Sequence, residues 1–192
     1  MSNFKLCAGD ILVNFSTAGD PWPVIRRWAI GPYFHCFMYM GVLRFGATRY
    51  RACAGRVPML FESNGRGVCL RMLSERYGEE VVVMRLNKYR RRIPRVLREA
   101  IKLASDPQSY YDYYVIFWHL IPRIIYSKLG LNPPLKYQRD ERQICSEALL
   151  EICLRAGVPV LPDDIVPLPG DFATDSCLLY PAWSGILTHK VV

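Results

Sequence analysis

The run from His35 to Leu43 (HCFMYMGVL) is apolar at every position after its first residue. A continuous apolar run of this length is expected for a strand that is buried on both faces, so other elements must cover the sheet that contains it. The chain has 192 residues, of which 51% are hydrophobic. This is enough for one well-buried core and too little for two, so we expect a single domain spanning residues 1–192.

Other segments predict the rest of the sheet and one helix. Strands are expected where β-branched and apolar residues cluster, at residues 10–15, 59–62, 68–73 and 81–86. Pro94 to Ala104 begins with proline and repeats its apolar residues at helical spacing. We expect a loop and a short helix over Ser16 to Gly31, a long connection over Gly46 to Pro58, and an extended, proline-rich tail over Val158 to Asp175. Together these segments predict an α+β fold, with helices packed on one mainly antiparallel sheet.

The run from Ile144 to Gly157 (ICSEALLEICLRAG) predicts a second helix, and Cys145 lies at its start. A thiol at a helix N-terminus is exposed to the positive end of the helix dipole and to unpaired backbone N–H groups, which favour the thiolate. The position therefore suits a cysteine nucleophile. Cys145 also lies on the apolar stripe of this helix, and a cysteine on such a stripe is more often a small core residue.

The cysteine count and spacing argue against disulfides and against metal. Seven cysteines are spread along the chain without a framework, and no C-x-x-C pair occurs. The three histidines, His35, His119 and His189, are isolated from one another. We therefore expect reduced thiols and no metal site.

The formal net charge is +8, and much of it lies between Lys88 and Arg98 (KYRRRIPRVLR). Such a cluster suits nucleic acid, an acidic membrane surface or an acidic partner, although it is more often a solvated surface. Nucleic acid is the less favoured partner, because the aromatic residues lie elsewhere in the chain. No segment predicts a membrane span or a secretion signal, so we expect a cytoplasmic protein with at most peripheral membrane contact.

Nucleophilic catalysis needs a base beside the nucleophile and a group that orients the base. His35 begins one predicted strand and Glu62 ends the next, so the two side chains can be neighbours across a sheet. His35 is then a candidate base and Glu62 a candidate orienting group. The alternatives are a structural histidine that begins a buried strand and an acidic residue exposed in a turn.

The order of segments resembles the circularly permuted branch of the NlpC-like papain-fold cysteine peptidases, the YiiX-like proteins. The resemblance runs from about Gly9 to Asp175, through the segments GDILVNF, PYFHCFMYMG, LFESNGRGV, VVVMRL, QICSEALLEICLRAGVP and PGDFATD. It implies a permuted papain-like fold with Cys145 as nucleophile, His35 as general base and later acid, and Glu62 as the residue that orients His35. Framework positions are implied for Gly9, Asp10, Pro169, Gly170 and Asp171.

The resemblance also implies an activity. It points to a cysteine hydrolase or acyltransferase that cleaves an amide, ester or thioester without a cofactor, on a peptide or lipid-like acyl substrate. Tyr111 and Asp112 match a pair that precedes the cysteine, and Trp118 lies in an aromatic stretch, so these three are candidate substrate-binding residues. The alternative is a papain-like scaffold without catalysis that binds an acidic partner through Lys88 to Arg98.

Overall fold

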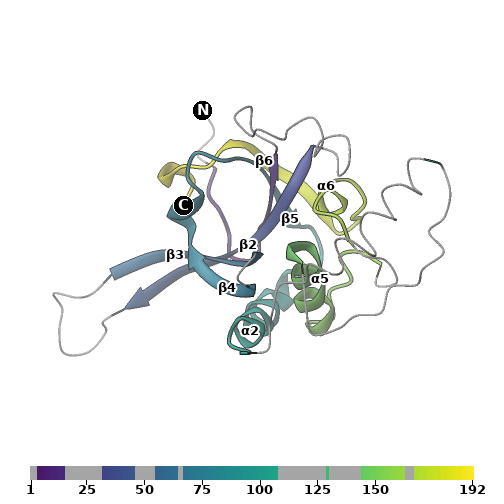
Figure 1. Cartoon of the computed structure of the whole chain (residues 1–192), viewed down its shortest axis with the longest axis horizontal. Helices are drawn as coiled ribbons and strands as arrows, with labels where there is room; N and C mark the ends of the chain where they lie inside the picture. Colours follow the sequence, from purple (N-terminus) through teal and green to yellow (C-terminus); the bar gives the residue numbers. More distant parts are fainter. Residues whose placement is uncertain are drawn as a thin grey trace.

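The computed structural model describes residues 4–15, 32–45, 55–64, 67–107, 129, 144–162 and 167–192. Within them the chain forms one curved, six-stranded sheet with helices packed against it (Figure 1). The strands are β1 (Ile11–Phe15), β2 (Tyr33–Phe45), β3 (Gly55–Asn64), β4 (Gly67–Met72), β5 (Glu80–Leu86) and β6 (Leu179–Ile186). They lie in the order β4-β3-β2-β1-β5-β6, and every neighbouring pair is antiparallel. The α+β class with a mainly antiparallel sheet is therefore confirmed.

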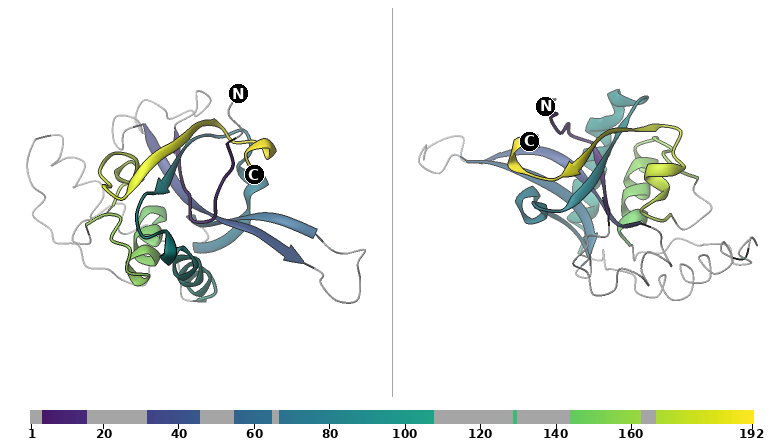
Figure 2. Two further views of the ribbon diagram at one scale, coloured as in Figure 1. Left: turned by 180° about the vertical axis from the view of Figure 1, so that it is seen from behind. Right: turned by 90° about the horizontal axis from the view of Figure 1, so that it is seen from above.

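Two helices, α2 (Ile93–Ala104) and α5 (Cys145–Arg155), pack against one face of the sheet (Figure 2). Their apolar residues join Val13, Met38 and Phe61 of the sheet in the larger core cluster. A smaller cluster, which includes Phe37 and Leu60, lies on the other face. The remaining helical segments are the short helix α6 (Asp171–Thr174) and the single turns η2 (Leu73–Arg76), η3 (Arg90–Arg92) and η5 (His189–Val191).

Several expectations about the elements need correction. The connection predicted over residues 46–58 is shorter, because β3 already begins at Gly55. The outer half of β2 is not buried on both faces, since Val42 and Leu43 are exposed. The tail expected to be extended contains α6, and β6 follows it although it includes Pro181. Proline is tolerated there because β6 is an edge strand, where one side of the backbone needs no partner.

Asp10 links β1 to its neighbours. Its carboxylate accepts two hydrogen bonds from the Arg85 guanidinium, at 2.8 and 2.7 Å, and one from the backbone N–H of Cys7 at 2.8 Å. Gly9 precedes it with a φ of +90°, a conformation that favours glycine. These contacts fit the framework role expected for Gly9 and Asp10. Among the described residues, no helix has the length and apolar character needed to cross a membrane.

Candidate active site

Three separate elements carry the predicted catalytic residues. His35 lies near the start of β2, Glu62 lies near the end of the adjacent antiparallel strand β3, and Cys145 is the first residue of α5. The helix α5 packs on both β2 and β3, the strands that hold the other two residues, and its first residue, Cys145, lies next to Cys36 of β2. The fold therefore brings together residues that are more than a hundred positions apart in the sequence.

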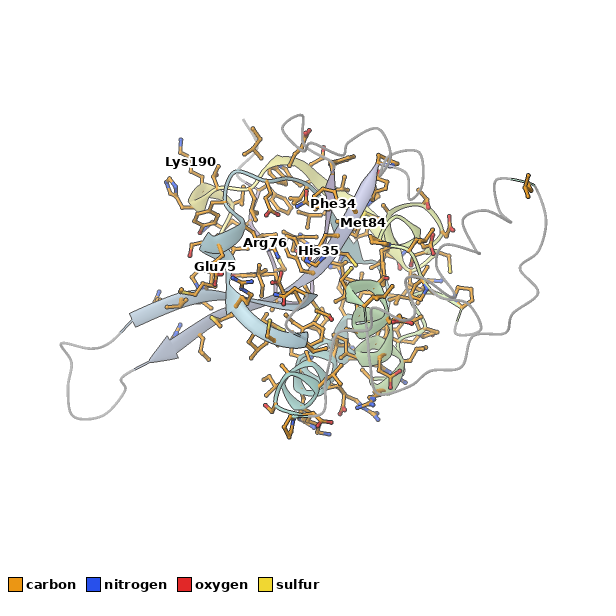
Figure 3. The ribbon with its side chains drawn as sticks, in the orientation of Figure 1. Phe34, His35, Glu75, Arg76, Met84 and Lys190 are labelled. Atoms are coloured by element: carbon orange, nitrogen blue, oxygen red, sulfur yellow. The ribbon has the colours of Figure 1, made fainter. Side chains whose placement is uncertain are left out.

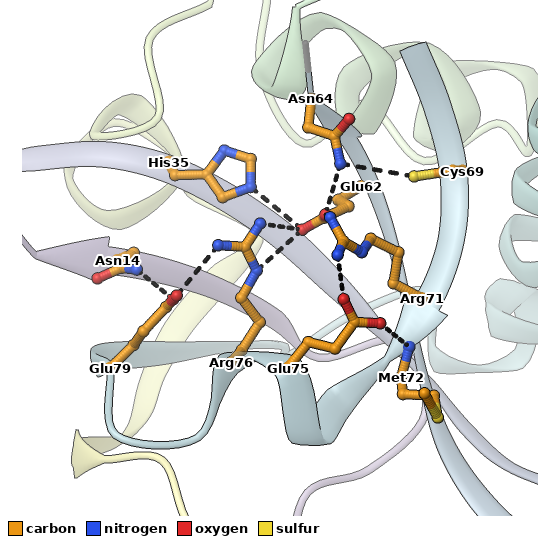
Figure 4. Close-up of polar contacts among 10 residues, drawn as sticks. All are labelled: Asn14, His35, Glu62, Asn64, Cys69, Arg71, Met72, Glu75, Arg76 and Glu79. Carbon is orange, nitrogen blue, oxygen red and sulfur yellow. Dashed lines mark hydrogen bonds and ion pairs between the residues drawn. The ribbon is translucent and has the colours of Figure 1, made fainter. Parts of the chain in front are cut away.

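His35 and Glu62 form a close pair. Nε2 of His35 lies 3.3 Å from Oε2 of Glu62 (Figure 4). The Glu62 side chain is fully buried, while that of His35 retains 14% of its surface exposed. Because Nε2 faces the carboxylate, Nδ1 is the ring nitrogen left for a thiol. Glu62 thus fixes the ring orientation in the way that nucleophilic catalysis requires.

Arg76 provides most of the remaining support for Glu62. Its Nη2 and Nε lie 2.7 and 3.1 Å from Oε2, the same oxygen that faces His35. The amide nitrogen of Asn64 donates to the other oxygen, Oε1, at 2.9 Å, and Nη1 of Arg71 reaches it at 3.5 Å. Burial by itself would raise the pKa of Glu62, but the hydrogen bond with His35, the charge of Arg76 and the Asn64 bond lower it to about 2. Glu62 is therefore a carboxylate at neutral pH.

Glu79 and Phe37 position the Arg76 guanidinium. Its Nη1 donates to Oε1 of Glu79 at 3.0 Å, and the amide nitrogen of Asn14 donates to the other oxygen of Glu79 at 2.5 Å. The Arg76 guanidinium also lies over the ring of Phe37, 5.6 Å from its centroid. Figure 3 shows Arg76 near His35, and Phe37 belongs to the core cluster on the other face of the sheet from α2 and α5. A chain of hydrogen bonds thus leads from the neutral amide of Asn14 through Glu79 and Arg76 to Glu62.

The environment of Cys145 favours its thiolate. A hydrogen bond from the Cys36 thiol is the largest cause that lowers the pKa of Cys145; burial opposes it, and the charge and hydrogen bond of His35 act with it. The backbone N–H of Cys36 contributes a further hydrogen bond. Together these interactions hold the pKa of Cys145 well below its usual range. The Cys145 residue is buried, with 7% of its surface exposed.

The pKa values of the neighbouring His35 and Cys36 are raised, in contrast to that of Cys145. Burial alone would lower the pKa of His35, but the charge and hydrogen bond of Cys145, together with the hydrogen bond to Glu62, raise it to about 9. Burial and the Cys145 thiolate raise the pKa of Cys36 well above its usual range, so Cys36 stays a neutral thiol. These shifts favour a thiolate at Cys145 and an imidazolium at His35, next to the carboxylate of Glu62.

The two residues after Cys145 hold the start of α5 in place. Oε2 of Glu147 accepts the backbone N–H of Ile144 at 2.9 Å, and the Ser146 hydroxyl donates to the carbonyl of Pro167 at 2.6 Å. Asp171, one of the expected framework residues, accepts the backbone N–H of Leu168 at 2.7 Å. The Cys-Ser-Glu sequence thus combines one residue in the site with two that fix the helix start.

The structure brings His35 and Glu62 within 3.3 Å of each other, and Cys145 lies close enough to His35 to affect its pKa. The catalytic roles of these three residues stay a prediction. Sequence reasoning missed Arg76 and Cys36 as their neighbours. Arg76 belongs to a polar segment without a recognisable motif, so no sequence pattern indicated it. Cys36 could have been noticed, because it follows His35 directly in the sequence. The candidate substrate-binding residues Tyr111, Asp112 and Trp118 lie outside the described residues.

The fold resembles that of a solved structure. It aligns with "Crystal structure of metalloprotein yiiX from Escherichia coli O157:H7, DUF1105" at a TM-score of 0.58 and 15% sequence identity, over 97% of this chain and 100% of that chain. At this identity the likeness concerns the fold alone. No protein-family model and no curated protein matches the sequence.

The yiiX structure is named a metalloprotein, but the described residues of this chain do not form a metal site. No group of three or more histidine, cysteine, aspartate or glutamate side chains suited to a metal ion occurs in the part of the chain that the structure describes. Oε2 of Glu62 already accepts two hydrogen bonds from the cationic Arg76. An additional cation at Glu62 would be repelled by this guanidinium. The residues around Glu62 do not fit a metal ion, and no step below involves one.

Proposed function

We propose that this protein is a cysteine hydrolase or acyltransferase that cleaves an amide, ester or thioester through Cys145, His35 and Glu62. The observation that carries the proposal is the geometry of the site. Nε2 of His35 lies 3.3 Å from the buried carboxylate of Glu62, and Cys145 is the first residue of the helix that packs on the same two strands. The charge of His35 is among the causes that lower the pKa of Cys145. This is the combination of nucleophile, base and orienting group that acyl transfer needs.

In the proposed reaction, the Cys145 thiolate attacks the substrate carbonyl carbon and forms a carbon–sulfur bond. The negative charge moves to the carbonyl oxygen, where backbone N–H groups at the start of α5 stabilise it. His35 then donates its proton to the leaving nitrogen, oxygen or sulfur, that bond breaks, and a thioester remains on Cys145. Water or another acceptor attacks the thioester and loses its proton to the neutral His35. The carbon–sulfur bond breaks, and the thiolate and imidazolium are restored.

The order of the residues supports a circularly permuted papain-like fold for this enzyme. The histidine strand and the glutamate strand come first, and the nucleophile helix comes late. The likeness to yiiX over nearly the whole chain agrees with the same branch. We propose peptide or lipid-like acyl compounds as the substrate class, because both present a carbonyl with a leaving group of the required kind.

A second candidate function is a scaffold that binds an acidic partner without catalysis. The observation that favours it is the exposure of the cluster between Lys88 and Arg98, in which Lys88, Arg91, Arg95 and Arg98 all face solvent. The burial of Cys145 also agrees with this candidate, because a scaffold needs no access to the thiol.

Selective alkylation distinguishes the two candidates. The native protein is treated with iodoacetamide from about pH 5 to 8, and the modified cysteines are located by mass spectrometry. An activated Cys145 reacts faster than the exposed Cys7 and Cys177, most clearly at the acidic end, where an ordinary thiol is protonated. In His35→Ala the advantage at about pH 6 falls by roughly tenfold, because the thiol loses the charge of His35 while the Cys36 thiol still lowers its pKa.

His189→Ala is the matched control, since His189 is exposed and distant in sequence from the site. It is expected to leave the labelling unchanged. If Cys145 reacts no faster than Cys7 at any pH, the thiolate is absent or inaccessible to solvent. The non-catalytic scaffold that binds an acidic partner is then the favoured function.

A further inference from the structure

One face of the sheet continues beyond the helices that cover it. Val57, Met59 and Phe61 alternate along β3 and so share a face, and Phe61 belongs to the core cluster with α2 and α5. In the strand register Leu43 lies opposite Val57, Met72 opposite Met59 and Leu70 opposite Phe61, so these three also belong to the helix side. Figure 1 shows the arms of β2 and β3 projecting past α2.

This continuation is apolar and uncovered in the described structure. Leu43 is 47% exposed, Met72 is 48% exposed and Leu70 is 37% exposed. Because α2 contacts β4, the strand that carries Leu70 and Met72 packs beside that helix, whereas Leu43 lies farther out on the arm of β2. Large exposed apolar side chains that cluster on one face often mark a site that binds a membrane or another molecule.

The outer side of α2 continues the same surface. Val96, Ala100 and Leu103 point into the core, so Pro94, Arg98 and Ile101 lie on the opposite side of the helix. Ile101 is 49% exposed, and all three outer residues face solvent. Along this side an arginine therefore lies between two apolar residues.

The cations of this region fall into two groups. The guanidinium of Arg92 donates to the carbonyls of Ala156 and Gly157, and that of Arg90 donates to the carbonyl of Leu86. These two arginines therefore stabilise the fold by binding backbone carbonyls. By contrast, the exposed residues Lys88, Arg91, Arg95 and Arg98 form no ion pair with any residue that the structure describes.

We propose that this surface binds an anionic lipid bilayer, with cations on the phosphates and apolar side chains at the boundary with the acyl chains. We name it the α2–β4 face and define it by six residues: Leu43, Leu70, Met72, Arg98 and Ile101, with Arg95 on the adjacent flank of α2 near Glu99. Anionic lipids attract nearby Lys and Arg side chains, and exposed aliphatic groups add affinity by entering the interface.

A nucleic acid fits the same surface less well. Phosphates account for the arginines, but Leu43, Met72 and Ile101 are aliphatic and offer neither a stacking surface nor a hydrogen bond to a base. An acyl boundary accounts for both sets of side chains. The inference does not rest on the chemistry at Cys145, so Cys145→Ser is expected to bind membranes as the wild type does.

Vesicle co-sedimentation tests the proposal on the full chain. The protein is expected to sediment with vesicles of phosphatidylcholine and phosphatidylglycerol, and not with phosphatidylcholine alone, at about 50 mM salt. Replacing Arg95 and Arg98 by glutamine weakens binding by roughly fivefold for each arginine, or about 25-fold for the pair. Ile101→Ser and Met72→Ser lower the fraction that remains bound at high salt, where the apolar contribution dominates.

Matched controls separate this face from net charge and from general hydrophobicity. Lys5→Gln with Lys190→Gln removes the same charge from exposed positions outside the face, and Ile186→Ser removes an exposed apolar side chain from the edge strand β6. These variants should bind as the wild type does. The proposal is overturned if the controls lose as much affinity as the face variants, or if anionic vesicles do not bind the protein. It is also overturned if duplex DNA binds as tightly as the vesicles and is indifferent to Ile101→Ser.

Discussion

Arg76 and His35 meet the same oxygen of Glu62. The Arg76 guanidinium approaches Oε2 with Nη2 at 2.7 Å and Nε at 3.1 Å, and Nε2 of His35 lies 3.3 Å from it. Arg76 helps to keep Glu62 ionised, while its positive charge is among the influences that lower the pKa of His35. Glu62 therefore orients the imidazole while an arginine limits how strongly the carboxylate stabilises the imidazolium.

Arg76→Gln tests this relationship. Losing the charge removes a repulsion from His35, so the pKa of His35 rises and the basic limb of the activity profile moves to higher pH. Glu62 also loses two hydrogen bonds, and we expect kcat/KM to fall by roughly tenfold to 100-fold as the ring is held less firmly. Once a substrate is known, pH profiles of kcat/KM measure both effects.

Arg71→Gln is the matched control for that experiment. Arg71 reaches Glu62 only at 3.5 Å and is paired mainly with Glu75. Its loss should leave the basic limb where it is in the wild type. Arg76→Lys keeps the positive charge, so its basic limb should lie at the wild-type pH. Its kcat/KM should still be below that of the wild type, because lysine cannot make both hydrogen bonds to Glu62. Equal shifts in Arg71→Gln and Arg76→Gln would contradict a specific role for Arg76.

The pH profiles of hydrolysis and alkylation should differ at high pH. The pKa of Cys145 is lowered and that of His35 is raised to about 9, so the ion pair exists between the two values. Hydrolysis needs the imidazolium proton for the leaving group and therefore declines above about pH 9. Alkylation needs only the thiolate and continues. Parallel rate measurements on both reactions test this, and a shared decline near pH 9 would argue against His35 as the acid.

Much of this site follows from patterns that are local in the sequence. The apolar runs of β2 and β5 and the helical repeat of α5 predict the elements, and the adjacency of two strands predicts that His35 and Glu62 are neighbours. Arg76 lies in the turn after β4, and its side chain meets Glu62 only because β3 and β4 pair as a hairpin. The strand β6 was missed because Pro181 and Gly185 interrupt a strand pattern. Both omissions depend on tertiary pairing that no single segment encodes.

Glu62→Gln should reduce stability in a way that depends on pH. The pKa of Glu62 falls from its ordinary value of 4.5 to about 2 on folding, so the carboxylate contributes stability above pH 4.5 and loses it as the pH falls toward 2. Neutralising Glu62 leaves Arg76 without its main partner, and we expect a loss of about 2 to 3 kcal/mol at neutral pH, discounted for the partial exposure of Arg76. Urea denaturation at several pH values measures the loss. A deficit that stays constant down to pH 2 would contradict the assignment.

Cys36→Ala should make Cys145 a less reactive nucleophile at low pH. The Cys36 thiol provides the largest stabilisation of the Cys145 thiolate, so its removal raises the pKa of Cys145. Alkylation of Cys145 then slows at about pH 5 to 6, while Cys36→Ser, which keeps a donor, retains more of the rate. Cys153→Ala is the control, because it removes a buried thiol of the same helix whose pKa burial raises to about 12. Equal slowing in both alanine variants would indicate a general loosening of α5.

Ser146→Ala should separate stability from chemistry at the helix start. The buried Ser146 hydroxyl donates to the carbonyl of Pro167 at 2.6 Å and so ties α5 to the segment before α6. Its loss leaves that carbonyl without this donor, and we expect unfolding to become easier by about 1 to 2 kcal/mol. The Ser146 hydroxyl is directed at the carbonyl of Pro167 rather than at the thiol, so the pH dependence of Cys145 alkylation should not change. Urea denaturation and alkylation of one protein preparation give both readouts. A shifted alkylation profile with unchanged stability would show that Ser146 acts on the thiolate rather than on the position of the helix.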